Sequence, residues 1–98
     1  MSHKYIAQCT GSYDIRADLK IIAMREAVDK IYQNHRRISV DDIHLSIANT
    51  DSYDGFYTVE YTFYFTAFGE SELDVEKIIQ KGEHLEILSA EWGNDYGK

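Results

Sequence analysis

The segment 56–68 constrains the fold of this chain more than any other part of the sequence, because its residue types alternate without a break. Successive side chains of a β-strand point to opposite faces, and strands favour β-branched and aromatic residues. The pattern therefore predicts one long strand with Phe63 and Phe65 buried and with Thr62 and Tyr64 on the opposite face. The first face comprises Tyr57, Val59, Tyr61, Phe63, Phe65 and Ala67, and the second comprises Thr58, Glu60, Thr62, Tyr64 and Thr66.

Two further strands are expected before this one. Residues 4–10 alternate as a short strand, and residues 11–14 are typical of a turn. Residues 42–49 alternate again, and the Asp-Gly pair that ends segment 50–55 is a strong hairpin signal.

A helix is expected between the first two strands. Asp14 or Asp18 would cap its start, and residues 34–37 would end it with positive charge, which the helix dipole favours there. Apolar residues at spacings of three and four predict its buried stripe, which consists of Ile21, Met24, Val28 and Ile31.

The last part of the chain predicts a short helix and a final strand. Ser71 and Asp74 have the spacing of a capping box and would begin the helix. Residues 84–92 alternate as a strand whose phase changes between Ile87 and Leu88, which indicates a bulge or a twist.

The predicted order is strand, helix, strand, strand, helix, strand, in a single domain that covers residues 1–98. This order predicts an α+β fold of the ferredoxin-like split βαβ type (βαββαβ), a four-stranded antiparallel sheet with both helices on one face. The alternative is a different α+β sheet in which the first strand pairs elsewhere.

Charge is distributed unevenly along the chain. Residues 1–40 have a balance of +3 and residues 41–98 a balance of −10, which gives a net charge of −7. Nucleic acids and anionic membranes attract cationic surfaces, so we expect direct binding to neither of them. A basic protein partner is favoured by the same physics, and the alternative is that the acids only keep the protein soluble. Tyr64 could stack on RNA bases, but Glu60 on the same face opposes this.

The sequence contains no recognisable catalytic or metal-binding pattern. Cys9 shares a strand face with Tyr5 and Ala7, which predicts a small core residue rather than a nucleophile. The histidines, His3, His35, His44 and His84, lack the spacing of a metal site. We therefore expect a protein that is not an enzyme and that has no cofactor.

Acidic residues and a tyrosine in predicted loops, element ends and the second helix form the candidate partner site. Tyrosine is common at binding hot spots because it combines apolar area with a polar tip. In composition alone, such a small acidic protein resembles phage-encoded inhibitors of the anti-CRISPR and anti-restriction type, which implies that it occupies a nucleic-acid-binding surface of its partner. The candidate residues are Asp41, Asp42, Asp51, Tyr53, Asp54, Glu70, Glu72, Asp74 and Glu76.

Self-association is the alternative function. A small regulatory domain could form a homodimer through its open sheet face or through an edge strand. The first four residues lack the layout of a signal peptide, and a single cysteine cannot form an internal disulfide, so a cytoplasmic location is expected.

Overall fold

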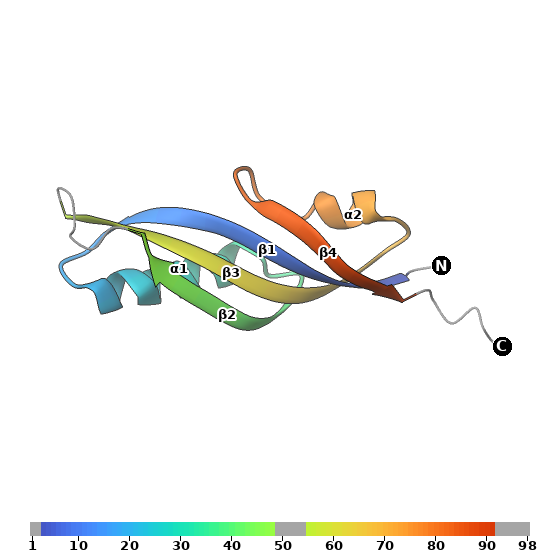
Figure 1. The fold of residues 1–98 in the computed structure, drawn as a ribbon, viewed down its shortest axis with the longest axis horizontal. Helices are drawn as coiled ribbons and strands as arrows, with labels where there is room; N and C mark the ends of the chain where they lie inside the picture. The colour runs from blue at the N-terminus through green and yellow to red at the C-terminus, as the bar shows by residue number, and fades with distance from the viewer. Residues whose placement is uncertain (1–2, 49–54, 92–98) are drawn as a thin grey trace.

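The computed structural model describes residues 3–48 and 55–91, which form four strands and two helices (Figure 1). The strands make one antiparallel sheet in the order β2-β3-β1-β4. The predicted α+β class and the four-stranded antiparallel sheet are confirmed. The elements are β1 (His3–Arg16), α1 (Lys20–Asn34), β2 (Ser39–Ile47), β3 (Phe56–Gly69), α2 (Glu72–Glu76) and β4 (His84–Glu91).

The two central strands, β1 and β3, pair along their whole length, from His3 opposite Gly69 to Arg16 opposite Phe56. The predicted turn at residues 11–14 is therefore wrong, because these residues continue β1. Each of them pairs with a residue of β3, and the Thr58 hydroxyl donates a hydrogen bond to Asp14 Oδ1 at 2.7 Å. Pairing across the sheet has overridden the local preference for a turn.

One face of the sheet is covered and the other is open. The odd-numbered residues of β1 and β3 are mostly buried, and Phe63 and Phe65 are almost fully inaccessible. Thr62 and Tyr64 on the other face are only partly buried, so the predicted assignment of the two faces is confirmed. Ile31 of α1 and Val75 of α2 belong to the same buried cluster, which places both helices on the covered face.

Helix α1 begins later and buries a different stripe from the one predicted. It starts at Lys20, after Leu19 rather than after an aspartate cap. Ile21 is 64% exposed, and Met24 and Val28 are only half-buried. The buried residues, Ala23, Ala27 and Ile31, recur every fourth position, and small alanines let the helix approach the sheet closely. The next position in this series is His35, which is also buried.

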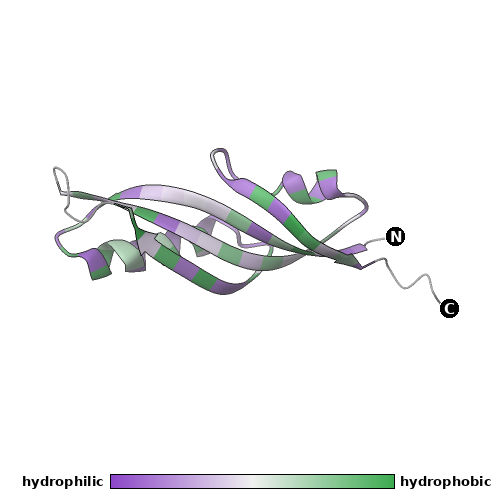
Figure 2. Ribbon diagram, viewed as in Figure 1, coloured by the Kyte–Doolittle hydropathy of each residue, from purple (hydrophilic) through white to green (hydrophobic). Residues whose placement is uncertain are grey.

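Both edge strands contain an irregularity. In β4 the pairing shifts between Ile6 and Ala7 of β1, so that Leu88 has no counterpart, and the predicted bulge is confirmed. In β2 the shift lies between Asp41 and Ile43, where Asp42 has a φ of 44°. Strand β2 also begins at Ser39, earlier than the predicted start at Asp42. Figure 2 shows alternating polar and apolar residues along both edge strands, as expected for strands with one covered face.

Helix α2 is short, but its start follows the predicted capping box. The backbone N–H of Ser71 donates to Asp74 Oδ2 at 3.3 Å, and that of Glu70 donates to the same oxygen at 2.8 Å. Among the described residues, neither helix is long and apolar enough to cross a membrane.

Candidate functional site

The predicted acidic residues fall into separate groups. Asp41 and Asp42 are exposed on β2, whereas the residues from Glu70 to Glu76 lie on or next to α2. Strands β2 and β4 are opposite edges of the sheet, and α2 borders a groove that β4 lines. The remaining candidates, Asp51, Tyr53 and Asp54, lie outside the described residues.

Asp74 differs from the other acids of this segment, because its carboxylate already has partners within the protein. One oxygen accepts the two backbone hydrogen bonds of the cap, and the other lies 4.0 Å from Lys77 Nζ. Its main contribution is therefore to hold the start of α2. Glu72 and Glu76 make no such contacts among the described residues and are exposed.

The groove between α2 and β4 combines acidic and apolar side chains. Glu72 and Glu76 come from the helix, and the half-buried Leu85 and Ile87 come from the strand. Within the described part of the chain, β4 pairs with β1 alone, so its outer edge has unpaired backbone groups. Such an edge can accept a further strand from a partner.

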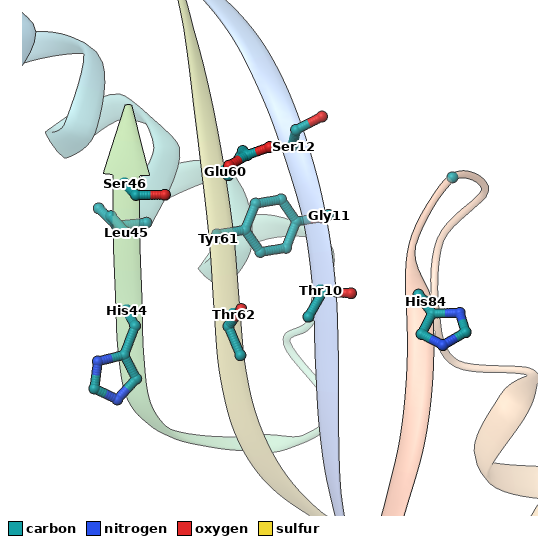
Figure 3. A pocket seen from close by; sticks show the side chains of 11 residues that line it. Thr10, Gly11, Ser12, His44, Leu45, Ser46, Glu60, Tyr61, Thr62 and His84 are labelled. Carbon is teal, nitrogen blue, oxygen red and sulfur yellow. The ribbon is translucent and has the colours of Figure 1, made fainter. Parts of the chain in front are cut away.

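A second hollow lies on the open face of the sheet (Figure 3). Its lining is polar, with Thr10, Ser12 and Thr62 around Glu60. His44 and His84 stand on the two edge strands, at opposite sides of the hollow in Figure 3. The two imidazoles are thus not brought together, and Glu60 is the only acid among the lining residues.

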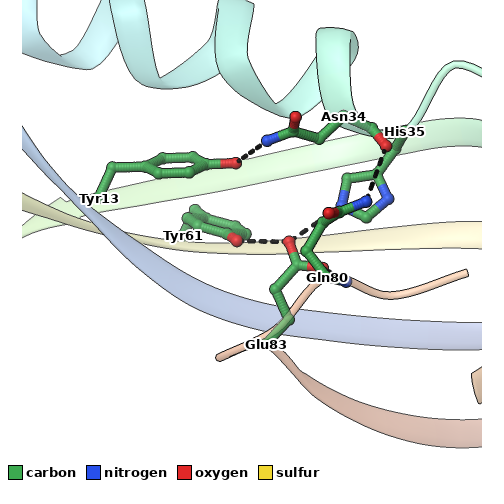
Figure 4. A network of polar contacts seen from close by, with 6 residues as sticks. All are labelled: Tyr13, Asn34, His35, Tyr61, Gln80 and Glu83. Carbon is green, nitrogen blue, oxygen red and sulfur yellow. Dashed lines mark hydrogen bonds and ion pairs between the residues drawn. The ribbon is translucent and has the colours of Figure 1, made fainter.

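The most heavily buried polar group of the described structure is centred on Glu83 (Figure 4). Tyr61 donates its hydroxyl to Glu83 Oε2 at 2.5 Å, and His35 Nε2 lies 2.9 Å from the same oxygen. The backbone N–H of Gln80 donates to Oε1 at 2.6 Å. The side chains of His35 and Glu83 are only 1% and 3% exposed. Both carboxylate oxygens of Glu83 therefore have partners in an environment with little water.

This environment changes the acidity of its members. Burial alone would raise the pKa of Glu83, but the hydrogen bonds from His35, Tyr61 and Gln80 outweigh it and lower the pKa. Burial and the neighbouring Glu83 charge raise the pKa of the Cys9 thiol, and burial and the hydrogen bond to Glu83 raise that of Tyr61. At neutral pH the group therefore contains a carboxylate next to an uncharged thiol and an uncharged phenol.

A second layer of contacts connects this group to α1. The rings of Tyr13 and Tyr61 stack with centroids 4.9 Å apart, and Asn34 Nδ2 donates to the Tyr13 hydroxyl at 3.0 Å. Gln80 Nε2 donates to the backbone carbonyl of Asn34 at 3.4 Å. The end of α1, the last part of β1 and the turn before β4 are thereby held together.

The sequence patterns gave no indication of this buried group. Cys9 is buried, as predicted, but His35 was assigned to the positively charged helix end at residues 34–37 and to the histidines that lack the spacing of a metal site. The series Ala23, Ala27, Ile31 and His35 would have placed it on the buried face if the stripe of α1 had been assigned correctly. No local signal marks Glu83, because its partners are far away in the sequence.

Comparisons with protein-family models, with curated proteins and with solved structures find no match for this chain.

Proposed function

We propose that this protein is a small non-enzymatic binding module that docks onto a basic partner through the edge of β4 and the neighbouring acidic face of α2. The observation that carries the proposal is the position of the α2 acids, Glu72 and Glu76, beside the open edge of the sheet. The partner is expected to present an extended segment with Lys or Arg at its borders. Backbone hydrogen bonds to β4 would supply affinity, and the acids would select the charge of the partner.

The charges of β4 itself favour the same partner. This strand carries Glu86 and Glu91 and contains neither Lys nor Arg. Leu85 and Ile87 add apolar surface to the groove, and Leu88 is 46% exposed at the bulge. A mixed acidic and apolar edge favours a segment in which basic and aliphatic residues alternate.

These charges also disfavour pairing between two copies of β4. Such a dimer would place Glu86 and Glu91 of both copies on the same face of one continuous sheet, and like charges that face each other across strands are destabilising. The alternative of a homodimer would therefore have to use the open sheet face or β2.

The partner surface is proposed to be one that ordinarily binds nucleic acid. A strand edge lined by carboxylates has the charge sign of a phosphate backbone, and surfaces that bind nucleic acid are rich in Lys and Arg. This is the basis for an inhibitor of the anti-CRISPR or anti-restriction kind, and it rests on charge rather than on any sequence motif.

A defined peptide tests the proposal directly. A peptide of alternating lysine and valine is titrated into isotope-labelled protein at 0.1 M salt, and backbone amide shifts are followed by NMR. We expect shifts along His84–Glu91 and Glu72–Glu76, and weaker binding at 1 M salt, where the screening length falls to ~3 Å.

Two matched charge reversals provide the control. Glu76→Lys should weaken peptide binding about fivefold, whereas Asp41→Lys on the opposite edge should leave it nearly unchanged. Shifts confined to the open face around Thr62 and Tyr64, or equal effects of the two reversals, would contradict the proposal. A dimer mass for the free protein in light scattering would favour self-association instead.

The ferredoxin-like assignment of the fold is part of the same proposal. Its support is the order of strands and helices along the chain and the packing of both helices on one face. It does not contribute to the functional argument, because this architecture hosts many unrelated functions.

A further inference from the structure

We propose that Cys9, His35 and Glu83 form a binding site for one divalent transition-metal ion of the zinc class. Their candidate ligand atoms, a thiol sulfur, an imidazole nitrogen and a carboxylate oxygen, all lie within 4.8 Å of one another. Zinc sites in proteins are built from these three ligand types. The inference does not depend on the proposed partner, and it shares with the docking surface only Glu83, which lines the same groove.

The three ligands come from parts of the chain that the fold brings together. Cys9 lies in the middle of β1, His35 directly follows α1, and Glu83 precedes β4. Cys9 is opposite Phe63 and Leu85 in the sheet, so its side chain faces the helices from a fixed backbone position. An ion at this point would connect three elements that are otherwise joined by apolar contacts and hydrogen bonds.

The distances are compatible with coordination after small side-chain movements. A tetrahedral zinc ion has ligand bonds of about 2.0–2.3 Å, which corresponds to about 3.5 Å between ligand atoms. His35 Nε2 and Glu83 Oε2 are now 2.9 Å apart and would separate slightly to admit the ion. Tyr61 Oη, 2.5 Å from Glu83 Oε2, or a water molecule would occupy the fourth position.

The charge of the ligand set fits a divalent ion in a dry site. Metal binding would displace the proton of the Cys9 thiol to solvent, and the resulting thiolate, the Glu83 carboxylate and a neutral imidazole would together balance two positive charges. A neutral complex avoids the large cost of a buried net charge. Cys9 is fully inaccessible, and the His35 and Glu83 side chains are nearly so, which makes this balance important.

The hydrogen bonds of the group leave His35 incompletely satisfied. Among the described residues, its Nδ1 is buried without a hydrogen-bond partner. Most buried polar atoms in proteins do have a partner, and an unsatisfied one costs free energy. Nε2 has Glu83 as its partner, so binding of an ion by Nε2 would exchange this one hydrogen bond for a metal bond and break no other hydrogen bond of the ring within the described structure.

An ion can reach the site from the surface. Glu83 lines the groove between α2 and β4, with His84 and Leu85 beside it. Glu83 therefore belongs both to the buried ligand set and to the lining of this groove, which is the side from which an ion would enter.

Cobalt(II) is a suitable probe, because thiolate coordination gives an absorption band in the near ultraviolet. Untagged protein, treated with chelator and reductant and then exchanged into chelator-free buffer, is titrated with Co²⁺ and then with Zn²⁺. We expect one Co²⁺ per chain with a thiolate band, displacement of the cobalt by zinc, and a higher melting temperature with zinc bound.

Variants separate this site from adventitious histidine binding. Cys9→Ala should abolish the thiolate band, and His35→Gln should weaken Co²⁺ binding at least about tenfold, since even outer-shell changes have that effect. His44→Gln and His84→Gln replace exposed imidazoles and should change neither the thiolate band nor the affinity for Co²⁺. Circular dichroism checks that each variant is folded, and Cys9→Ser, which nearly keeps the size of the buried side chain, replaces Cys9→Ala if that variant is not and should likewise lack the thiolate band.

The proposal is overturned if wild-type protein shows no thiolate band, or if Cys9→Ala retains full affinity while His44→Gln or His84→Gln loses it. The charge reversal Glu76→Lys tests the docking surface without altering a metal ligand. Failure of peptide binding and failure of metal binding are therefore separate results.

Discussion

The ring of Tyr61 crosses the backbone of β1 directly over Gly11, its partner in the sheet. A Cβ atom on residue 11 would lie 2.6 Å from Tyr61 Cζ, so the Tyr61 ring fills the space that a side chain at residue 11 would need. Because a side chain is absent at residue 11, the Tyr61 hydroxyl can reach Glu83. Gly11, which the sequence predicts to be part of a turn, therefore leaves room in the core for the aromatic ring of Tyr61.

Gly11→Ala is expected to destabilise the protein by about 1–3 kcal/mol, the usual cost of an overpacked core. The added methyl group would displace Tyr61 and weaken its hydrogen bond to Glu83. Urea denaturation followed by circular dichroism measures the change. Ser12→Ala, at an exposed position of the same strand, should stay within about 0.5 kcal/mol of wild type. Equal stability of the Gly11→Ala variant and wild type would show that the ring does not need this space.

Phe63→Ala should cost about 3–5 kcal/mol, because Phe63 is fully buried and packs against His35 and Phe65. Thr62→Ala removes a half-exposed side chain from the next position and should cost much less. Thermal melts of the two variants compare the faces of β3 directly. A larger loss for Thr62→Ala would mean that the faces are reversed.

Glu83→Gln is expected to destabilise the metal-free protein by about 2–4 kcal/mol, since it removes the charge from a buried group that three donors surround. Glu86→Gln changes the same residue type at an exposed position of β4, three residues further along the chain, and serves as control. Both are measured by urea denaturation in the presence of chelator. Similar losses of unfolding free energy in the two variants would show that the buried Glu83 charge does not contribute to stability.

A double-mutant cycle between Tyr61→Phe and Glu83→Gln measures the hydrogen bond itself. The single change Tyr61→Phe should cost about 1–3 kcal/mol, and the two changes together should cost less than their sum by about 0.5–3 kcal/mol. Tyr64→Phe, on the open face, should show no coupling to Glu83. Strict additivity of the first pair would indicate that the two groups do not interact in solution.

Elements with two unlike faces could be predicted from the sequence, and elements whose character depends on distant partners could not. The alternation of 56–68 identified β3 and its buried face, and the phase change at Leu88 located the bulge in β4. The first strand was predicted too short, because Gly11 and Asp14 have the composition of a turn and are held in the strand by β3.

The buried face of helix α1 could not be predicted from the apolar residues alone. Its large apolar residue Ile21 is exposed, whereas Ala23 and Ala27 are buried, because close packing against a sheet favours small side chains. The misplaced stripe concealed His35, and with it the whole buried group. Cys9, His35 and Glu83 are widely spaced in the sequence, so only the folded chain brings them together.

The position of β1 between β3 and β4 has a consequence for the order in which the protein can fold during synthesis. Strand β1 is made before both of its neighbours in the sheet, and of the described elements β4 is made last. Until β4 has emerged, the second edge of β1 remains unpaired and exposed to other chains. Contacts this distant in sequence also slow folding. Nascent chains that end before His84 should therefore depend on chaperones far more than chains that include β4.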